Sequence, residues 1–252
     1  MAGIQGRDAS LRYLCISRGE VSTRFSEADA DPVLHGLPVR KPPTYRRQRN
    51  YPGLFWSATT ESFLIYESLL ELDCLWLKDF NSTVEWIATQ PFDMTGWCAG
   101  RSRRHVPDIM LQMNSGRVRV VDVKPEQRLD DPDTATVFKW TGEVCAERGW
   151  DYEVWSGASS TLLRNTKFLG SARRRPLVSD DELISVMDAF SEGQTFGEVI
   201  DARILRGGNE HLVRTALLHL LWCGALAFDM ERPLHEGSVL FRGAAGFNVI
   251  NV

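Results

Sequence analysis

Hydrophobic and polar positions follow two periods along the first two thirds of the chain. Apolar residues recur at three- and four-residue spacing over residues 60–80, which predicts a long helix capped by Thr59 or Thr60. The period then changes to two, which predicts strands at residues 84–92, 105–113 and 117–124. Residues 96–104 are rich in Gly, Arg and Ser and predict a loop, and residues 114–116, Asn-Ser-Gly, predict a hairpin turn.

A second helix and a fourth strand complete this pattern. Asp131 and Pro132 predict a helix start, and Gly149 predicts its end. A helical crossover then makes the strand at residues 150–155 parallel to the third strand, whose valines predict burial on both faces. With a short helix at residues 160–169, the expected fold class is α/β, in the order helix, three strands, helix, strand.

The rest of the chain predicts two further regions. Residues 171–178 form a break, after which Ser179-x-x-Glu182 and Thr195-x-x-Glu198 each predict a helix start. A third helix at residues 210–223 and a hairpin at residues 225–241 complete the pattern of a small winged-helix-like α+β domain. Residues 1–56 are expected to be an irregular basic arm, either solvated or in contact with phosphates, because nine Lys and Arg face five Asp and Glu there. The expected division is therefore 1–56, 57–170 and 177–252.

Composition excludes several classes of protein. The 252 residues are 43% hydrophobic with a formal charge of −4, which fits a globular protein and excludes a histone-like basic one, though a local basic cleft remains possible. Five scattered cysteines without a C-x-x-C pair argue against a disulfide framework or zinc ribbon and favour a reducing, cytoplasmic location. Residues 1–7 do not form a signal peptide, and Arg214, His219 and Gly224 interrupt the most apolar stretch, so no membrane association is expected.

Four polar residues carry the candidate chemistry. Glu71 lies on the first helix, Asp108 on the second strand, and Asp122 and Lys124 share one face of the third strand. Charged groups in a valine-rich strand are costly unless they are paired or bind a metal. Converging carboxylates would form an oxygen site suited to Mg²⁺ or Mn²⁺, and an adjacent lysine could orient water or stabilise phosphoryl charge. The simplest alternative is a surface strand with an Asp–Lys ion pair.

Two levels of resemblance follow from these motifs. Pro107-Asp108, followed after a gap by Asp122-Val123-Lys124, resembles the signature of the PD-(D/E)xK nuclease superfamily, whose core has the predicted element order. More narrowly, the chain resembles the TnsA family, endonuclease subunits of heteromeric transposases. That resemblance is carried by the motifs at residues 68–72 (Ser-Leu-Leu-Glu-Leu), 90–92 (Gln-Pro-Phe), 105–108 (His-Val-Pro-Asp) and 122–125 (Asp-Val-Lys-Pro).

The resemblance implies a site and a function. The implied catalytic residues are Glu71, Asp108, Asp122 and Lys124, and the implied ligands of Mg²⁺ (or Mn²⁺) are Glu71, Asp108, Asp122 and Val123. The implied function is metal-dependent DNA endonuclease, hydrolysing phosphodiesters at the 5′ ends of a transposon. The implied partners are double-stranded DNA at the transposon ends, an integrase-like transposase subunit and an AAA+ ATPase. Two other functions stay open: a stand-alone nuclease of restriction, repair or phage defence, and a catalytically inactive winged-helix scaffold.

Some assignments have competitors. Glu67 lies one turn before Glu71 and could be the helix ligand instead. The predicted loop supplies Arg101, Arg103, Arg104 and His105 as candidate DNA contacts, or as a solvated loop with a histidine at a strand entrance. The winged-helix-like domain lacks a clear basic face, so we expect it to dock proteins rather than read DNA.

Overall fold

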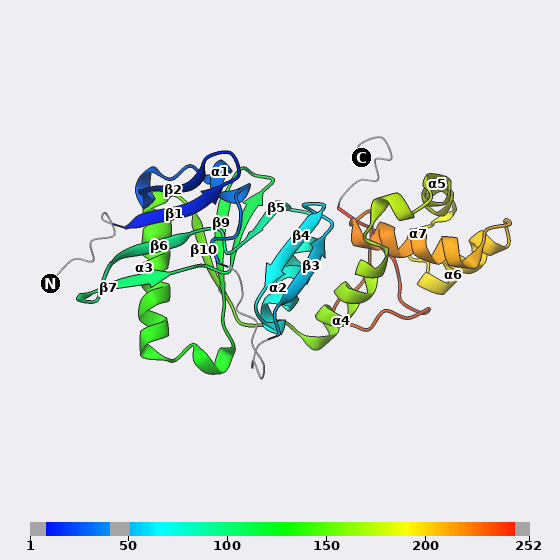
Figure 1. Ribbon diagram of the computed structural model, residues 1–252. Coiled ribbons are helices and arrows are strands. Elements are labelled where there is room, and N and C mark those ends of the chain that lie inside the picture. Colours follow the sequence, from blue (N-terminus) through cyan, green and yellow to red (C-terminus); the bar gives the residue numbers. More distant parts are fainter. Residues whose placement is uncertain (1–8, 41–50, 245–252) are drawn as a thin grey trace. The chain divides into compact units, whose positions relative to one another are not determined.

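The computed structural model describes residues 9–40 and 51–244 (Figure 1). The chain divides into two compact units, Met1–Gly157 and Ala158–Val252, which are described separately. The division falls earlier than the break expected at residues 171–178. The helix α4 (Ser160–Leu169), expected to close the first unit, therefore belongs to the second.

A mixed four-stranded sheet organises the first unit. Its strands are β5 (Val84–Thr89), β8 (Ile109–Met113), β9 (Val118–Val123) and β10 (Asp151–Trp155), in the order β10-β9-β8-β5. The helix α3 (Pro132–Arg148) crosses from β9 to β10, and these two strands are parallel, as the sequence predicts. Asp131 caps α3 by accepting the Thr134 N–H at 2.8 Å, and Gly149 ends it with a φ of 80°.

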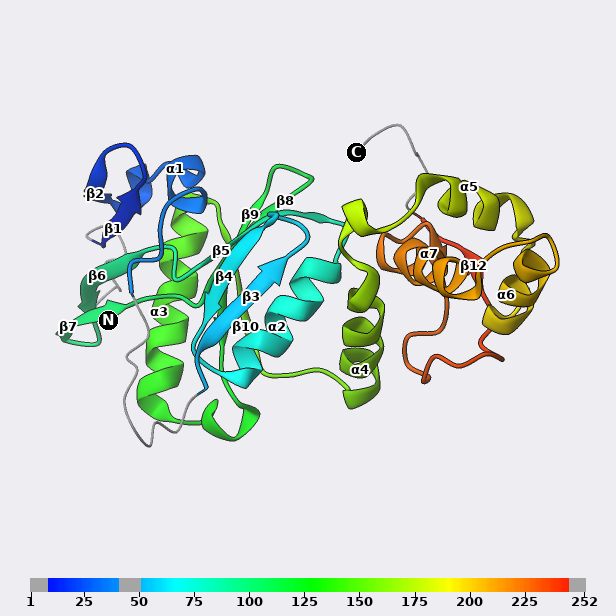
Figure 2. The ribbon, with the colours of Figure 1, turned by 45° about the vertical axis from the view of Figure 1, so that its right-hand side comes forward.

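Both faces of this sheet are covered (Figure 2). Val120 of β9 belongs to a core with Trp140 of α3, whereas the adjacent Val121 belongs to a second core with Leu75 of the helix α2 (Leu69–Phe80). The prediction that β9 is buried on both faces is therefore confirmed. The α3 face is the one to which Asp122 also belongs, because alternate residues of a strand share a face.

The first helix is shorter than predicted. Residues 62–66, expected within it, form β4 (Ser62–Tyr66), paired antiparallel with β3 (Gly53–Ser57). Phe63, Ile65 and Tyr66 are residue types that favour strands, so the apolar spacing alone gave the wrong element. Ser68, rather than Thr59 or Thr60, caps α2 by accepting the Glu71 N–H.

The loop expected at residues 96–104 is instead a hairpin. β6 (Asp93–Cys98) and β7 (Arg101–His105) pair antiparallel, and Ala99 and Gly100 turn the chain with positive φ. Met94 and Cys98 alternate inward to the core beside α3, which makes this segment a strand despite its polar residues. The strand predicted over residues 105–113 is therefore divided. His105 ends β7, residues 106–108 lie between the strands, and β8 begins at Ile109.

The hairpin belongs to a second sheet that the sequence did not predict. Its order is β2-β1-β6-β7, with β1 (Ser10–Cys15) and β2 (Gly19–Arg24) followed by the short helix α1 (Ala30–Leu34). The expectation of an irregular segment over residues 1–56 is therefore wrong for residues 10–34 and, because β3 begins at Gly53, for residues 53–56. Phe25 and Leu34 anchor this part in the core. Among the nine basic residues counted in residues 1–56, Lys41, Arg46, Arg47 and Arg49 lie outside the described residues.

The second unit is mainly helical. After α4 come α5 (Asp180–Ala189), α6 (Phe196–Ile204) and α7 (Glu210–Trp222), then the short antiparallel pair β11 (Leu226–Ala227) and β12 (Phe241–Arg242). The predicted caps Ser179 and Thr195 are confirmed, and Thr195 forms a full capping box with Glu198. The winged-helix assignment stays a prediction. Across the described residues, no helix has the length and apolar character needed to span a membrane.

Candidate active site

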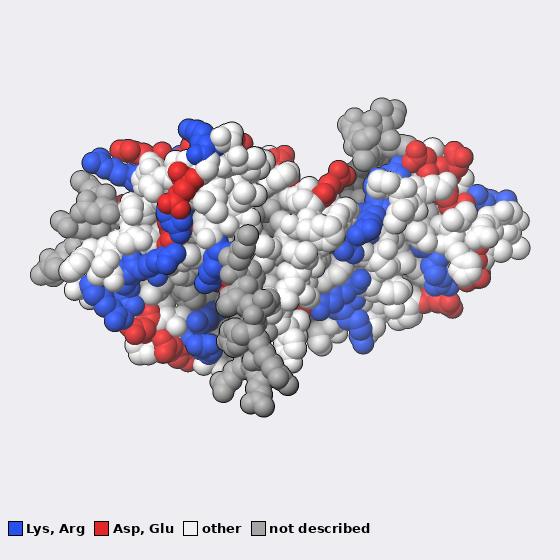
Figure 3. All heavy atoms as spheres, viewed as in Figure 1, with Lys and Arg blue, Asp and Glu red and all other residues white. Residues whose placement is uncertain are grey.

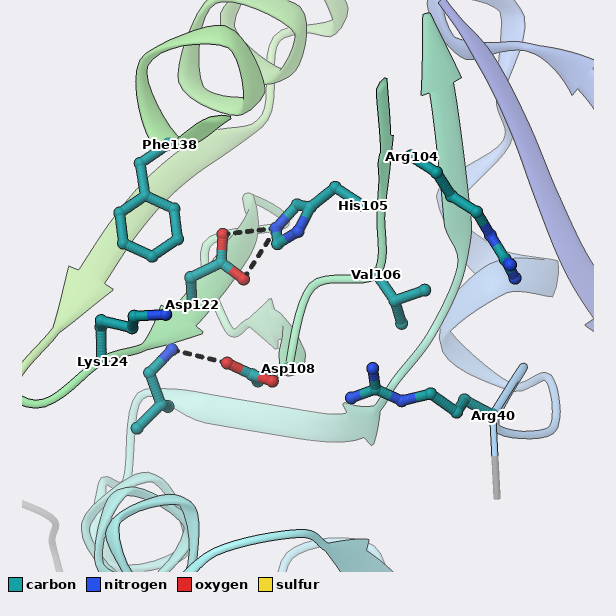
Figure 4. A pocket seen from close by; sticks show the side chains of 9 residues that line it. Arg40, Arg104, His105, Val106, Asp108, Asp122, Lys124 and Phe138 are labelled. Atoms are coloured by element: carbon teal, nitrogen blue, oxygen red, sulfur yellow. Dashed lines mark hydrogen bonds and ion pairs between the residues drawn. The ribbon is translucent and has the colours of Figure 1, made fainter. Parts of the chain in front are cut away.

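A cleft of about 420 Å³ opens in the first unit, where β7 ends and β8 begins (Figure 4). It contains four of the predicted site residues together with two of the predicted DNA contacts. The cleft is lined by Arg40, Arg104, His105, Val106, Asp108, Asp122, Val123, Lys124 and Phe138. In Figure 4 the carboxylate of Asp122 points toward His105, and that of Asp108 points toward the Val123 nitrogen.

Strand register brings the two aspartates together. Ile109 lies opposite Val121 in the antiparallel β8–β9 pair, so Asp108, just before β8, and Asp122 lie opposite each other on the same side. Because β8 begins only at Ile109, the Val123 N–H has no strand partner on that side. It donates instead to Oδ2 of Asp108 at 2.7 Å. The carboxylate of Asp108 is thereby fixed at the edge of the sheet.

The carboxyl group of Asp108 lies in a poorly solvated place. Burial raises its pKa well above the ordinary value, and the charges of Asp122 and Glu71 raise it further. The Val123 N–H and the guanidinium of Arg40 act in the opposite direction but do not offset these effects. The cleft therefore favours a cation beside Asp108.

Asp122 is held by hydrogen bonds on both of its oxygens. Nε2 of His105 lies 3.0 Å from Oδ1 and 2.8 Å from Oδ2, and the Tyr152 hydroxyl donates to Oδ2 at 2.5 Å. Asp122 is only 1% exposed, so these bonds satisfy a carboxylate that has almost no contact with solvent. Tyr152 stays a donor because burial, followed by the charge of Asp122, raises the pKa of its phenol.

Glu67 and Glu71, near the start of α2, are not among the lining residues. Glu71 accepts the Ser68 hydroxyl at Oε1 and the Glu67 N–H at Oε2, so both oxygens support the first turn of α2. Glu67 pairs with Arg40 at 2.7 Å. Neither glutamate lines the cleft, although the charge of Glu71 reaches Asp108 electrostatically.

The predicted arginines divide into two groups. Arg104 lines the cleft and pairs with Asp93, which also pairs with Arg12. Arg101 and Arg103 both pair with Asp133 at the start of α3 and do not line the cleft. One face of the first unit carries many Lys and Arg side chains with acidic ones among them (Figure 3, left half).

The donor set suits a hard divalent cation. Within residues 9–40 and 51–244, no group of three or more His, Cys, Asp or Glu side chains is arranged to hold a metal. Mg²⁺, however, commonly binds through one or two carboxylates and keeps several waters. Asp108 meets that need, because only its Oδ2 accepts a hydrogen bond in the described part of the chain and its surroundings raise its pKa.

Sequence reasoning missed three residues at this site. Arg40 is one of the nine basic residues counted in residues 1–56 and was given no role in the site, yet its guanidinium reaches toward Asp108 (Figure 4). Tyr152 follows from the parallel β9–β10 pair, which places it opposite Val120 on the Asp122 side of the sheet. Phe138, an apolar residue on the predicted second helix, carries no signal in the sequence that would place it in a cleft.

The mixed α/β fold presents Asp108 before one strand and Asp122-Val123-Lys124 at the end of the next, as an α/β nuclease-like fold would require. Residues 81–157 match the family model described as TnsA-like endonuclease N terminal. This segment is thus similar to TnsA-like endonuclease domains, and it spans β5 to β10 with every cleft residue except Arg40. No curated protein matches the chain.

Proposed function

We propose that this protein is the metal-dependent DNA endonuclease subunit of a Tn7-type heteromeric transposase and that it hydrolyses phosphodiesters at the 5′ ends of the transposon. The observation that carries the proposal is the meeting of Asp108, Val123 and Lys124 in one cleft, inside the segment similar to TnsA-like endonucleases.

The cation would be held by Asp108, with Glu71 as a second carboxylate that already influences Asp108 electrostatically. Val123 can contribute only main-chain atoms, and its carbonyl faces the same edge as its N–H, as in any extended strand. A bound Mg²⁺ or Mn²⁺ would supply Lewis acidity toward a phosphate oxygen and a lower pKa for water.

The chain's own residues orient the reactants. Lys124 makes no ion pair in the described part of the chain, so its ammonium group is free to face a phosphate or the attacking water. Arg40 and Arg104 sit on the cleft wall, where guanidinium groups can bind the flanking phosphates. Hydrolysis joins the water oxygen to phosphorus and breaks the bond to O3′, which takes up a proton. The products are a 5′-phosphate and a 3′-hydroxyl.

The place of the reaction in transposition rests on the resemblance. In that setting an integrase-like subunit cuts and joins the 3′ ends, and an AAA+ ATPase regulates both activities. Genes for such proteins beside this one would support the transposase setting over a stand-alone nuclease.

The test uses the full chain with a plasmid carrying the transposon ends, in Mg²⁺ or Mn²⁺, with and without the neighbouring transposase and ATPase. We expect strand cleavage at the 5′ ends, lost by at least about a hundredfold in Asp108→Ala and in Lys124→Ala, the scale seen when one transition-state contact is removed. Lys139→Ala, an exposed lysine on α3 that pairs with Glu143, is the matched control. Cleavage at near wild-type rate by the Asp108 or Lys124 variant would refute the site.

A further inference from the structure

Asp122 is the most buried of the acidic residues at the cleft, and its neighbours come from two other strands. His105 ends β7 and Tyr152 lies on β10, so the carboxylate of Asp122 on β9 is held from both sides. A carboxylate fixed in this way cannot turn toward Asp108 without giving up hydrogen bonds in a place that water does not reach. Its geometry therefore differs from that of Asp108, which has one oxygen without a hydrogen bond among the described residues.

The same bonds define which ring nitrogen of His105 carries the hydrogen. A carboxylate accepts hydrogen bonds and does not donate them, so Nε2 of His105 carries the hydrogen that points at Asp122. In the neutral ring, Nδ1 is then the nitrogen with a free lone pair. Within residues 9–40 and 51–244 no group donates to this nitrogen.

The His105 ring lies at the site. His105 lines the cleft with Asp108 and Lys124, and its side chain is 17% exposed. Phe138 packs edge-on near the ring, with centroids 6.4 Å apart. Because Nε2 faces Asp122, Nδ1 is the nitrogen that remains for a small ligand in the cleft.

We propose that His105 is a catalytic residue that accepts a hydrogen bond from the attacking water at Nδ1, and that Asp122 is a positioning residue that fixes the His105 tautomer rather than a metal ligand. The proposal rests on the proposed nuclease function. Carboxylate–imidazole pairs set which ring nitrogen is available for chemistry in the same way elsewhere.

The first test observes the tautomer directly, by long-range ¹H–¹⁵N NMR of the ¹⁵N-labelled full chain at a pH where the ring is seen to be neutral. The resonances of His105 are assigned with His105→Gln. We expect protonation at Nε2 in the wild type and a mixture of tautomers in Asp122→Asn. His219 is an internal control of the opposite kind, because its Nδ1 donates to the Ala172 carbonyl at 2.7 Å. A wild-type His105 protonated at Nδ1, or an unchanged pattern in Asp122→Asn, would overturn the positioning role.

The second test measures cleavage and metal binding in the same variants. We expect His105→Ala and Asp122→Asn each to lower kcat about tenfold to a hundredfold with KM unchanged, and the double variant to be no slower than His105→Ala. Both should keep the Mn²⁺-induced rise in melting temperature, which Asp108→Asn should lose. If Asp122→Asn loses that rise while His105→Ala cuts normally, Asp122 is a metal ligand and the proposal is wrong.

The two tests also separate this inference from the function on which it rests. A wild-type chain that cuts no DNA with its partners present would refute the nuclease proposal and, with it, the role of His105 toward water. The NMR result would still decide whether Asp122 fixes the ring.

Discussion

Ser68 and Glu71 cap each other at the start of α2. The Glu71 N–H donates to the Ser68 hydroxyl oxygen at 3.2 Å, and that hydroxyl donates to Oε1 of Glu71 at 2.9 Å. The second oxygen of Glu71 accepts the Glu67 N–H at 2.8 Å. A glutamate expected from its motif to be catalytic therefore also holds a helix terminus, and the two roles can be separated by mutation.

We predict that Ser68→Ala lowers the free energy of unfolding by about 1 kcal/mol, the usual cost of losing a side-chain N-cap, and leaves cleavage nearly unchanged. Glu71→Gln should leave the free energy of unfolding nearly unchanged and lower the rate of cleavage. An amide can still accept the Glu67 N–H but cannot supply a negative charge to a cation. Denaturant unfolding and plasmid cleavage measure the two effects. Wild-type cleavage by Glu71→Gln would leave Glu71 with a structural role alone and would bring Glu67 forward as the helix ligand.

Divalent metal should stabilise the first unit. Asp108, Asp122 and Glu71 bring negative charge together, and burial raises the pKa of Asp108 before the charges of the other two raise it further. A cation that binds only the folded state at a concentration a hundred times its Kd adds about 2.7 kcal/mol of stability. We expect thermal melts in millimolar Mg²⁺ or Mn²⁺ to shift upward by several degrees, compared with NaCl of equal ionic strength. An equal shift in Asp108→Asn would place the bound metal elsewhere.

The sequence predicted the parts of this site that local signals control. The hairpin at Gly116, the Asp131 cap and the valines of β9 were enough to place Asp108 opposite Asp122. The β3–β4 pair was missed because Phe63, Leu64 and Tyr66 fit a helical spacing as well as a strand. The partners of Asp122 could not be predicted. His105 ends β7 and Tyr152 lies near the start of β10, and no local sequence signal shows that these two strands bring their side chains to Asp122.

Asp93 gives the first unit a defined sensitivity to acid. Burial would raise its pKa, but hydrogen bonds from Arg104 and Arg12 outweigh that effect and lower it below the ordinary 3.8. Because the pKa of Asp93 is lower in the folded state, the stabilisation from its bonds to Arg104 and Arg12 is fully present above the unfolded-state pKa. It is lost as the pH falls through the folded-state pKa.

We therefore predict that Asp93→Asn costs about 1–2 kcal/mol at neutral pH, since Asp93 is buried while Arg104 is mostly exposed. The difference from the wild type should shrink as the pH falls below about 4. Urea unfolding at a series of pH values measures it. Glu27→Gln removes an exposed pair with Arg24 and should have little effect at any pH. A cost for Asp93→Asn that does not change with pH would show that lost packing, not charge, causes it.

The second unit is expected to dock partner proteins. Arg203 pairs with Glu182 and Arg232 with Asp229, so acidic side chains lie among its basic ones. Its surface also exposes large apolar side chains, including Leu177 at 74% and Leu205 at 88%. Exposed apolar groups of this kind suit contacts with protein more than with a phosphate backbone.

We predict that a chain ending at Gly157 keeps DNA affinity within about threefold at fixed salt but no longer captures the transposase and ATPase subunits. Salt must be held constant because phosphate contacts weaken steeply as its concentration rises. Circular dichroism of the shortened chain checks that it is folded, and residues 158–252 alone should capture at least one partner. Leu205→Asp in the full chain should weaken that capture without changing DNA affinity, because it places a charge on an exposed apolar side chain of the second unit, whereas the proposed phosphate contacts belong to the first. If the shortened chain loses DNA binding and still captures both partners, the second unit reads DNA, and the docking role is wrong.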